Sequence, residues 1–557
     1  MSKPSRLIND TIYNHIECSK FEDMLLQTRV INRLFFITQN ALAYFAYPSI
    51  NTKRYIHSLG TMHLSAHIFK NSLLNSKTNI REKFLKKLKT SIELHLQNSD
   101  TKIGELSSFN DTALNEYMIS LKIEKTKTVY FIALQAIRVA GLLHDVGHFP
   151  FSHQVEYAMQ KIYSSLQDKK ELNKKEKEFA KFYENITNNG EYVLHEAIGI
   201  QLVKMLFEYE LLENEYDHKQ KVYTNLIYKI VLNILNDTDD GVFDYGVLHR
   251  IIDGTVDADR LDYINRDMLA SGYISGGLDF RRITKQAVLV QSNKKFLITF
   301  FDGELIDIEH MLEMRFNLYK KVIFNHKISL TDALLENVIL FLAQNYFEDD
   351  KSEDIKQTDS ISMLWRFFKQ NDREKALDII SQLDENWLIT LFKKEYFNIK
   401  YKQDHTFDDK KYIVSFEEVL FGKKLYTSVW KNLNDLYNEL GFDKNQRYRF
   451  RESFGYVNQN RFNKLQKLLD RFCKKYEDSQ KDIFFTYRIV SLNIGIDKDF
   501  SLYDEFDLIK IDEISTVRKR LKKSILNTVP FYLFSNSPKL SDKMKDDIKE
   551  ILHDVFI

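Results

Sequence analysis

The chain has 557 residues, 44% of them hydrophobic, which is typical of a globular protein with two or more lobes and excludes a disordered chain. Its 80 Lys and Arg residues balance 79 Asp and Glu residues, so the net charge of +1 indicates no overall attraction to nucleic acid or to anionic membranes. Cys18 and Cys473 are too few for a disulfide framework, and no run of about 18 apolar residues predicts a membrane span, so we expect a cytoplasmic protein.

Helix is the expected conformation of most of the chain, because only 5 prolines and 17 glycines interrupt it. Apolar residues recur at helical spacing, as in HEAIGIQLVKMLFEYELLE from His195 onward. Two regions depart from this pattern: residues 287–305 predict a β-hairpin, and residues 484–512 contain strand-like runs. We therefore expect a mainly α fold with small antiparallel β elements.

In chain order, the first segment of chemical interest is RYIHSLGTMHLSAHIF, where His57 and Arg54 stand at the start of a predicted helix. The second is LLHDVGHFPFSH, residues 142–153, in which a predicted helix ends near Gly147. At a helix end, adjacent His144 and Asp145 can both reach one ion, offering a neutral nitrogen and an anionic oxygen, a pair that suits a divalent transition metal.

The third segment, TVDADRLDYINRD at residues 255–267, places several carboxylates close together. A single histidine is more often a partly buried side chain with its hydrogen bonds satisfied than a metal ligand. Three separated segments that each supply ligand types weaken that alternative. From the residues alone, the grouping predicts metal-assisted hydrolysis of a phosphate ester.

The ordered set H…HD…D resembles the HD superfamily, and its flanks resemble the deoxynucleoside triphosphate triphosphohydrolases, the family of bacterial dGTPases and the SAM-and-HD-domain dNTPase. RYIHSLG is similar to that family's R-F-x-H-S-L-G, HDVGHFPFSH to its H-D-x-G-H-x-P-F-S-H, and DADRLDYINRD to its D-x-D-[KR]-x-D-Y-x-x-R-D. HE at 195–196 matches a downstream His-Glu of the family. The resemblance extends over about two-thirds of the chain.

The resemblance implies a divalent metal ion, whether manganese, iron, magnesium, zinc or nickel, held by His57, His144, Asp145 and Asp259. It implies that the catalytic histidines, of which the first two are the candidates for acid–base work, are His148, His153 and His195. It also implies that the residues contacting the phosphates and the sugar are Gln39, Arg54, Arg260, Tyr263, Asp267 and Arg315. Core packing remains the alternative for Tyr263, and a surface ion pair the alternative for Arg315.

The implied reaction is hydrolysis of a deoxynucleoside triphosphate (dNTP) to deoxynucleoside and inorganic triphosphate. One departure bears on the substrate, since Ile323, in RFNLYKKVIFNHK, stands where the family has a tyrosine that reads the sugar. We therefore expect the sugar or base pocket to differ from that of the family. No Gly-rich phosphate loop of the type G-x-x-x-x-G-K-[ST] predicts a second nucleotide site.

The expected architecture is an HD-domain helical core over residues 1–345 and a C-terminal α+β lobe over 346–557, with a small β element near 484–512. The polar stretch NYFEDDKSEDIKQTDS, residues 345–360, is the candidate linker. An insertion near 75–128 either caps the cleft or is a peripheral elaboration or subunit contact. Residues 346–480 have no clear counterpart in the family and are candidates for oligomer contacts or an allosteric site.

The favoured function is a dNTP triphosphohydrolase in dNTP pool control, such as replication control, or in phage defence. The resemblance implies an activating nucleotide and a homo-oligomer, a dimer, tetramer or hexamer. One alternative is another HD phosphoesterase acting on a cyclic nucleotide, a nucleoside monophosphate or single-stranded nucleic acid. The other is a nucleotide-sensing scaffold without turnover, which the intact ligand set disfavours.

Overall fold

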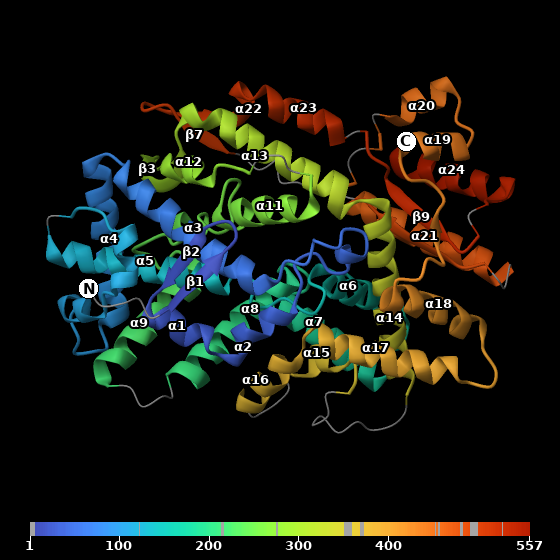
Figure 1. The fold of residues 1–557 in the computed structure, drawn as a ribbon, viewed down its shortest axis with the longest axis horizontal. Helices are drawn as coiled ribbons and strands as arrows, with labels where there is room; N and C mark the ends of the chain where they lie inside the picture. The colour runs from blue at the N-terminus through green and yellow to red at the C-terminus, as the bar shows by residue number, and fades with distance from the viewer. Residues whose placement is uncertain are drawn as a thin grey trace.

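The structure is a computed structural model that describes residues 6–121, 123–212, 217–273, 277–349, 359–367, 373–451, 453–454, 457–479, 483–490, 500–525, 527–537 and 539–557. Helices dominate it, as predicted (Figure 1). The N-terminal helices lie at one end of the long axis, and α18 to α21, β9 and α24 gather at the other end.

Two long buried helices, α3 (Arg54–Leu74) and α5 (Glu124–Leu143), pack against each other at the centre of the first half. By length and hydropathy α5 could cross a membrane, but 89% of its most apolar stretch is buried inside the protein. Neighbouring helices cover this pair: α4 (Thr78–Leu96) and α9 (His218–Leu235) pack on α5, and α11 (Ala258–Ser271) packs on α3.

Shorter helices and the long α14 surround this core. They are α1 (Lys20–Leu26), α2 (Arg29–Asn32), α6 (His153–Gln167), α7 (Lys174–Thr187), α8 (Leu194–Met205), α10 (Gly246–His249), α12 (Phe280–Lys285), α13 (Leu305–Leu318) and α14 (His326–Glu348). Irregular helical turns include η3 (Ile103–Phe109), η4 (Thr112–Tyr117) and a π-helical turn, η7 (Tyr319–Ile323).

The strands of the described residues form four small antiparallel sheets. These pair β1 (Arg6–Asp10) with β2 (Asn14–Cys18), β3 (Ala287–Ser292) with β4 (Lys295–Phe300), β9 (Phe531–Ser535) with both β5 (Thr427–Ser428) and β6 (Phe485–Ile489), and β7 (Ser501–Tyr503) with β8 (Leu508–Lys510). The hairpin expected at 287–305 is β3–β4, and it turns at Asn293 and Lys294 with φ of 48° and 66°.

The strand-like runs of 484–512 do form strands, but these belong to two sheets, because β6 pairs with β9 while β7 pairs with β8. Residues 491–499 of this region lie outside the described residues. Strand propensity indicates that a segment is extended and does not reveal a partner 40 residues away. The β1–β2 hairpin was not predicted at all.

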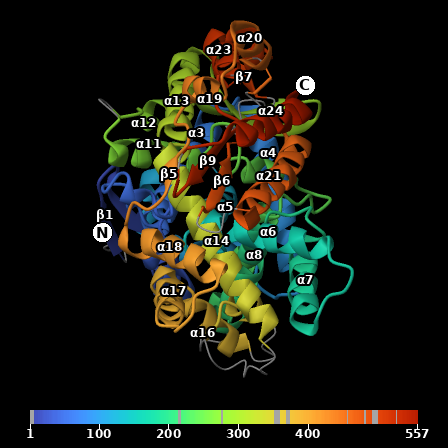
Figure 2. The same ribbon diagram turned by 90° about the vertical axis from the view of Figure 1, so that its right-hand side faces the viewer.

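The remaining helices belong to the second half of the chain. They are α15 (Met363–Arg366), α16 (Arg373–Gln382), α17 (Glu385–Lys400), α18 (Phe407–Phe421), α19 (Leu433–Glu439), α20 (Lys444–Arg451), α21 (Gln459–Ser479), α22 (Ile511–Ile514), α23 (Thr516–Ile525) and α24 (Asp542–Phe556). Figure 2 shows α14 near the middle of the view, where α18 and β6 from this half and α6 from the first half pack against it. Helix α14 therefore joins the two halves; the central residues of the candidate linker, 350–358, lie outside the described residues.

The insertion near 75–128 comprises α4, η3, η4 and the start of α5. It packs on α5 and α9, and Tyr117 Oη lies 2.8 Å from His63 Nδ1. None of its described residues lines the cleft presented below. Its position is consistent with a peripheral elaboration and gives no indication of a cap.

Candidate metal centre and substrate cleft

Four predicted ligands converge from three helix ends. His57 lies in the first turn of α3, His144 and Asp145 directly follow α5, and Asp259 lies in the first turn of α11. His57 Nε2 lies 2.9 Å from Asp259 Oδ1 and 3.4 Å from Asp145 Oδ2. His144 Nε2 lies 3.4 Å from Asp145 Oδ1 and 3.7 Å from Asp259 Oδ1. The four side chains thus surround a single point.

Both imidazole rings are oriented through their other nitrogen. His57 Nδ1 lies 2.8 Å from Asp262 Oδ2, and His144 Nδ1 lies 2.8 Å from the Gly141 carbonyl oxygen. Asp262 is itself held by Arg266, and Gly60 makes room for it, because a Cβ at Gly60 would lie 1.9 Å from Asp262 Oδ1. Such contacts fix the tautomer and direct Nε2 toward the centre.

The donor set fits a divalent cation. The Nε2 atoms of His57 and His144 are buried, and neither has a hydrogen bond of normal geometry with a described residue. Burial lowers the pKa of His57, but the carboxylates of Asp259 and Asp262 outweigh burial and raise it to about 10. The carboxylates therefore draw positive charge to this point, and two imidazole nitrogens with two carboxylates suit a transition metal. His57, His144 and Asp145 each offer a ligand atom within 4.8 Å of the others.

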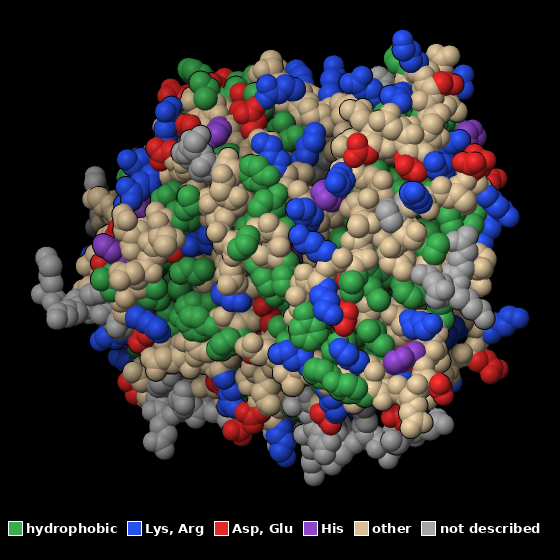
Figure 3. Space-filling model, turned by 45° about the vertical axis from the view of Figure 1, so that its right-hand side comes forward, with side chains coloured by type: hydrophobic (Ala, Val, Ile, Leu, Met, Phe, Trp, Pro, Cys, Tyr) green, Lys and Arg blue, Asp and Glu red, His purple; other side chains and the backbone are tan. Residues whose placement is uncertain are grey.

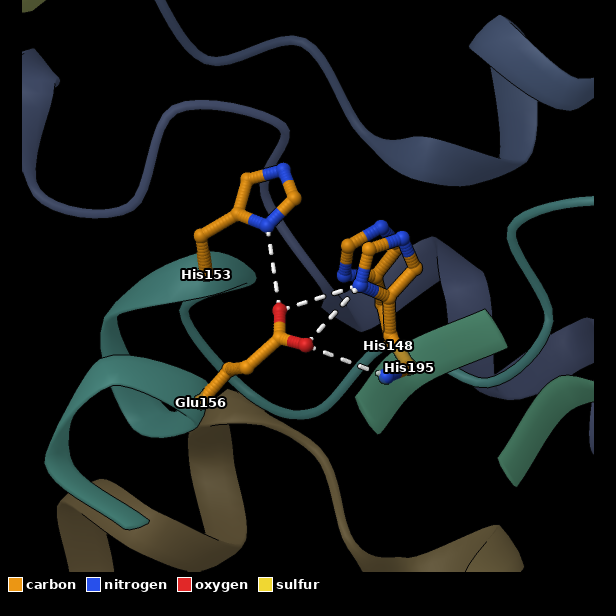
Figure 4. Close-up of side chains that lie close together, drawn as sticks. All are labelled: His148, His153, Glu156 and His195. Atoms are coloured by element: carbon orange, nitrogen blue, oxygen red, sulfur yellow. Dashed lines mark hydrogen bonds and ion pairs between the residues drawn. The ribbon is translucent and has the colours of Figure 1, made fainter. Parts of the chain in front are cut away.

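A second cluster lies beside this centre and contains the three predicted catalytic histidines together with Glu156 (Figure 4). Glu156 Oε2 lies 3.2 Å from His153 Nδ1 and 3.0 Å from His195 Nδ1. The rings of His148 and His195 are stacked, with centroids 3.9 Å apart. His148 Nε2 lies 3.3 Å from Asp145 Oδ1, which connects the cluster to the metal centre.

The histidines of this cluster have different proton affinities. Burial lowers the pKa of His148 well below its usual value, and the nearby charges of Arg54 and His195 add to the effect. Burial also lowers the pKa of His195, but the adjacent Glu156 outweighs it and raises that pKa. His148 therefore releases a proton more readily than the His195 ring stacked on it, an arrangement suited to proton transfer.

The turn before α6 has an uncommon backbone. Phe151 and Ser152 have φ of 57° and 55°, which is rare for residues other than glycine. Ser152 Oγ accepts a hydrogen bond of 2.8 Å from Arg54 Nε and donates one of 2.5 Å to the Thr38 carbonyl. These bonds stabilise the turn, which sets His153 at the first position of α6.

The arginines proposed to hold phosphate are all buried and differ in their contacts. Arg54 forms an ion pair with Asp145, so it contacts a candidate metal ligand directly. Arg260 donates to the Gly254 carbonyl and lies 3.4 Å from Asp257. The guanidinium of Arg315 lies 5.6 Å from the ring centroid of Tyr319, and its Nε has no hydrogen-bond partner among the described residues.

The other residues proposed to contact the nucleotide are Tyr263, Asp267 and Gln39, which lie near the candidate metal centre or line the cleft beside it. The ring of Tyr263 is 6.4 Å from that of His57. Asp267 is buried, and burial raises its pKa to about 6. Asp267 Oδ1 and Gln39 Oε1 are both buried without a hydrogen-bond partner among the described residues, so each can still accept one.

A cleft of about 500 Å³ extends from the histidine cluster to the second half of the chain. At the catalytic end it is lined by Gln39, His153, Tyr319 and Ile323. Ile323, which departs from the family pattern, is thus part of the cleft wall. At the other end, residues of α6 and α14 face residues of α21 and β6.

The sequence interpretation missed two residues that organise the site, Glu156 and Asp262. Glu156 lies three residues after His153, a spacing that places both on one face of a helix, and this signal was available. Asp262 was seen as one of several carboxylates after residue 255. Its spacing from Asp259 does not reveal that it bonds the opposite nitrogen of His57.

Residues 113–233 match the model of the HD domain. The chain carries an HD domain. His144, Asp145 and the histidine cluster lie inside the matched residues, whereas His57 and Asp259 come from helices outside them. The match supports a hydrolase of the HD type, and HD domains bind divalent metals.

The chain is similar to two curated triphosphohydrolases. It is 23% identical over 390 residues to the deoxynucleoside triphosphate triphosphohydrolase SAMHD1 homolog of Dictyostelium discoideum, which covers 68% of this chain and 59% of that protein. It is 21% identical over 407 residues to human deoxynucleoside triphosphate triphosphohydrolase SAMHD1, which covers 68% of this chain and 53% of that one. The chain thus aligns with little more than half the length of these relatives.

The fold is also that of a solved structure. A phosphohydrolase from Bacteroides thetaiotaomicron superposes with a TM-score of 0.53 at 16% identity, and the match covers 95% of this chain and 99% of the other. The similarity therefore extends through the second half of the chain, beyond the HD domain.

Proposed function

We propose that the protein is a metal-dependent hydrolase that cleaves dNTPs to deoxynucleoside and inorganic triphosphate. The observation that carries the proposal is the convergence of two carboxylates, Asp145 and Asp259, on the buried Nε2 atoms of His57 and His144. The similarity to two triphosphohydrolases supports the choice of substrate class.

A divalent ion held by the four ligands would lower the pKa of a water molecule and offset charge on the phosphate oxygens. The chain's own residues supply the proton. In the proposed reaction water attacks the α-phosphorus, the bond from phosphorus to O5′ breaks, and a proton passes to O5′. His153 lines the cleft and passes on this proton, which comes from His195, because Glu156 raises the pKa of His195 while burial lowers that of His153. Glu156 also holds both rings in place.

Substrate contacts follow from the lining of the cleft. Gln39 and Asp267 have buried oxygen atoms free to accept hydrogen bonds from the sugar, and Arg315 retains a buried Nε without a partner for the phosphates. Although the net charge is only +1, Lys and Arg side chains gather along the middle of one face, where they would favour a polyanion (Figure 3).

We place this activity in the cytoplasm, in dNTP pool control or phage defence, with an activating nucleotide and a homo-oligomer. Two alternatives are kept, another HD phosphoesterase and a nucleotide-sensing scaffold. The intact set of candidate ligands and the intact histidine cluster favour turnover over sensing alone.

The deciding experiment incubates the purified protein with Mn²⁺ or Mg²⁺ and with single and mixed dNTPs, NTPs, cyclic nucleotides and single-stranded DNA, and identifies products by chromatography. Deoxynucleoside with triphosphate is the expected result. Monophosphate or diphosphate products alone would exclude the proposed cleavage. The absence of any product with every substrate and mixture would favour the nucleotide-sensing scaffold. Asp145→Ala should abolish turnover, whereas exposed Asp546→Asn should not.

A further inference from the structure

The distal end of the cleft contains a buried carboxylate with an open oxygen. Asp332, in the second turn of α14, is 4% exposed and lines the cleft. Its Oδ1 atom is buried and has no hydrogen-bond partner among the described residues. A buried polar atom without a partner costs free energy, so its presence in a cleft points to a ligand that supplies the missing donor.

The charged neighbours of Asp332 are paired with other groups. Arg488 Nη1 lies 3.1 Å from Glu336 Oε2, and Lys161 Nζ lies 3.4 Å from Glu336 Oε1. Asp470 accepts a hydrogen bond of 2.6 Å from Tyr487 Oη and lies 3.9 Å from Lys161 Nζ. Asp332 Oδ1, in contrast, has no hydrogen-bond partner among the described residues. Burial raises the pKa of Asp332 to about 7, although the positive charge of Arg488 acts to lower it.

The position of Asp332 relative to the catalytic end suits a nucleoside. His153, Tyr157 and Lys161 recur every four residues along one face of α6, and all three line the cleft. Eight residues of helix separate His153 from Lys161 by about 12 Å. A nucleotide with its reacting phosphate at His153 would extend its base along this face, toward the end where Asp332 lies.

We propose that this end of the cleft is the nucleobase subsite and that Asp332 selects guanine, an inference that rests on the proposed function. A carboxylate can accept two hydrogen bonds side by side, and guanine alone among the four bases offers adjacent N1–H and N2–H donors. In adenine and cytosine the amino group adjoins a ring nitrogen acceptor, and in thymine the single N3–H lies between two carbonyl oxygens. Arg488, beside Asp332, provides donors suited to the guanine O6.

The test compares the protein with Asp332→Asn and with the matched control Asp470→Asn, which makes the same change in a neighbouring carboxylate outside the cleft lining. We expect the unaltered protein to prefer dGTP in an equimolar dNTP mixture. Asp332→Asn should lower kcat/KM for dGTP roughly 10- to 100-fold and leave dATP unchanged. The inosine analogue dITP keeps N1–H and lacks the amino group, so the unaltered protein should hydrolyse it with a kcat/KM between those for dGTP and dATP. The control Asp470→Asn should retain the preference for dGTP.

A binding measurement separates this inference from the proposed function. Calorimetry with the α,β-imido analogues of dGTP and dATP requires no turnover. Weaker binding of the dGTP analogue to Asp332→Asn supports the subsite even if no dNTP is hydrolysed, which would count against the proposed function alone. Hydrolysis of all four dNTPs at equal rates, unaffected by Asp332→Asn, would overturn the subsite and leave the hydrolase standing. Thermal melting of each variant verifies that it is folded.

Discussion

A Cβ atom on Gly147 would lie 2.0 Å from the carbonyl oxygen of His195. The turn that follows the candidate metal ligands His144 and Asp145 is therefore packed directly on the start of α8. This contact holds the metal centre and the histidine cluster at a fixed separation, and only glycine permits it.

Gly147→Ala should accordingly displace α8 from the turn. We expect a loss of about 1–3 kcal/mol in the free energy of unfolding, measured by denaturant titration, together with a large loss of turnover. Gly104→Ala is the control, because a Cβ there meets no atom within 4 Å. Equal stability of the two variants would contradict the close packing.

Asp262→Asn should weaken metal binding although Asp262 is not a proposed ligand. The change removes the carboxylate that holds His57 Nδ1, and loss of such an outer contact typically lowers metal affinity about 10- to 100-fold. Metal content per chain, measured by mass spectrometry after dialysis against a chelator, tests this expectation. Retention equal to that of exposed Asp546→Asn would show that His57 needs no such support.

Glu156→Gln should reduce kcat roughly 10²- to 10⁴-fold with little change in KM, since Glu156 orients two histidines of the cluster and is not itself a residue of the cleft lining. Glu156 raises the pKa of His195, so the neutral amide should lower that pKa. His195 would then lose its proton at lower pH. The alkaline limb of the pH–rate profile should move to lower pH, and an unmoved profile would assign Glu156 a purely structural role.

Asp332→Asn should change the pH dependence of stability. The folded-state pKa of about 7 exceeds the ordinary value of 3.8, so between these pH values the folded state binds more protons than the unfolded state. The free energy of unfolding of the unaltered protein therefore falls as pH rises from about 4 through 7. Asn does not ionise, so the free energy of unfolding of the variant should not fall in this way. At pH 8 the variant should be more stable than the unaltered protein by roughly a few kcal/mol, and at pH 4 it should have no such advantage. If the free energy of unfolding, measured by chemical denaturation, depended on pH in the same way in both proteins, the raised pKa of Asp332 would be contradicted.

Short motifs at helix ends made much of the centre predictable. His144 and Asp145 lie where the periodic pattern of α5 stops, and Asp259 lies in the first turn of α11, two residues after the N-cap Asp257, so sequence alone indicates where these side chains are. Their convergence on one point depends on how α3, α5 and α11 pack. Hydrophobic periodicity does not predict that packing, and the grouping of the four ligands was predicted from the family resemblance.

The distal end of the cleft could not be predicted. Asp332 stands in an ordinary helical pattern, and the cleft around it forms only because β6, more than 100 residues later, packs on α14 and residues of α21 supply the facing wall. Likewise, β6 finds its partner β9 across residues that carry no pairing signal. Long-range contacts of this kind are set by tertiary packing.

The cleft has one wall from α6 and α14 and another from α21 and β6, so its two sides are made at different times during synthesis. The four candidate ligands leave the ribosome long before Gln459, the first cleft residue of α21. A nascent chain would thus possess the candidate metal centre while the cleft beside it stood open to bulk water. Completion of the last hundred residues, rather than formation of the metal centre, is the event that would make a newly made molecule selective.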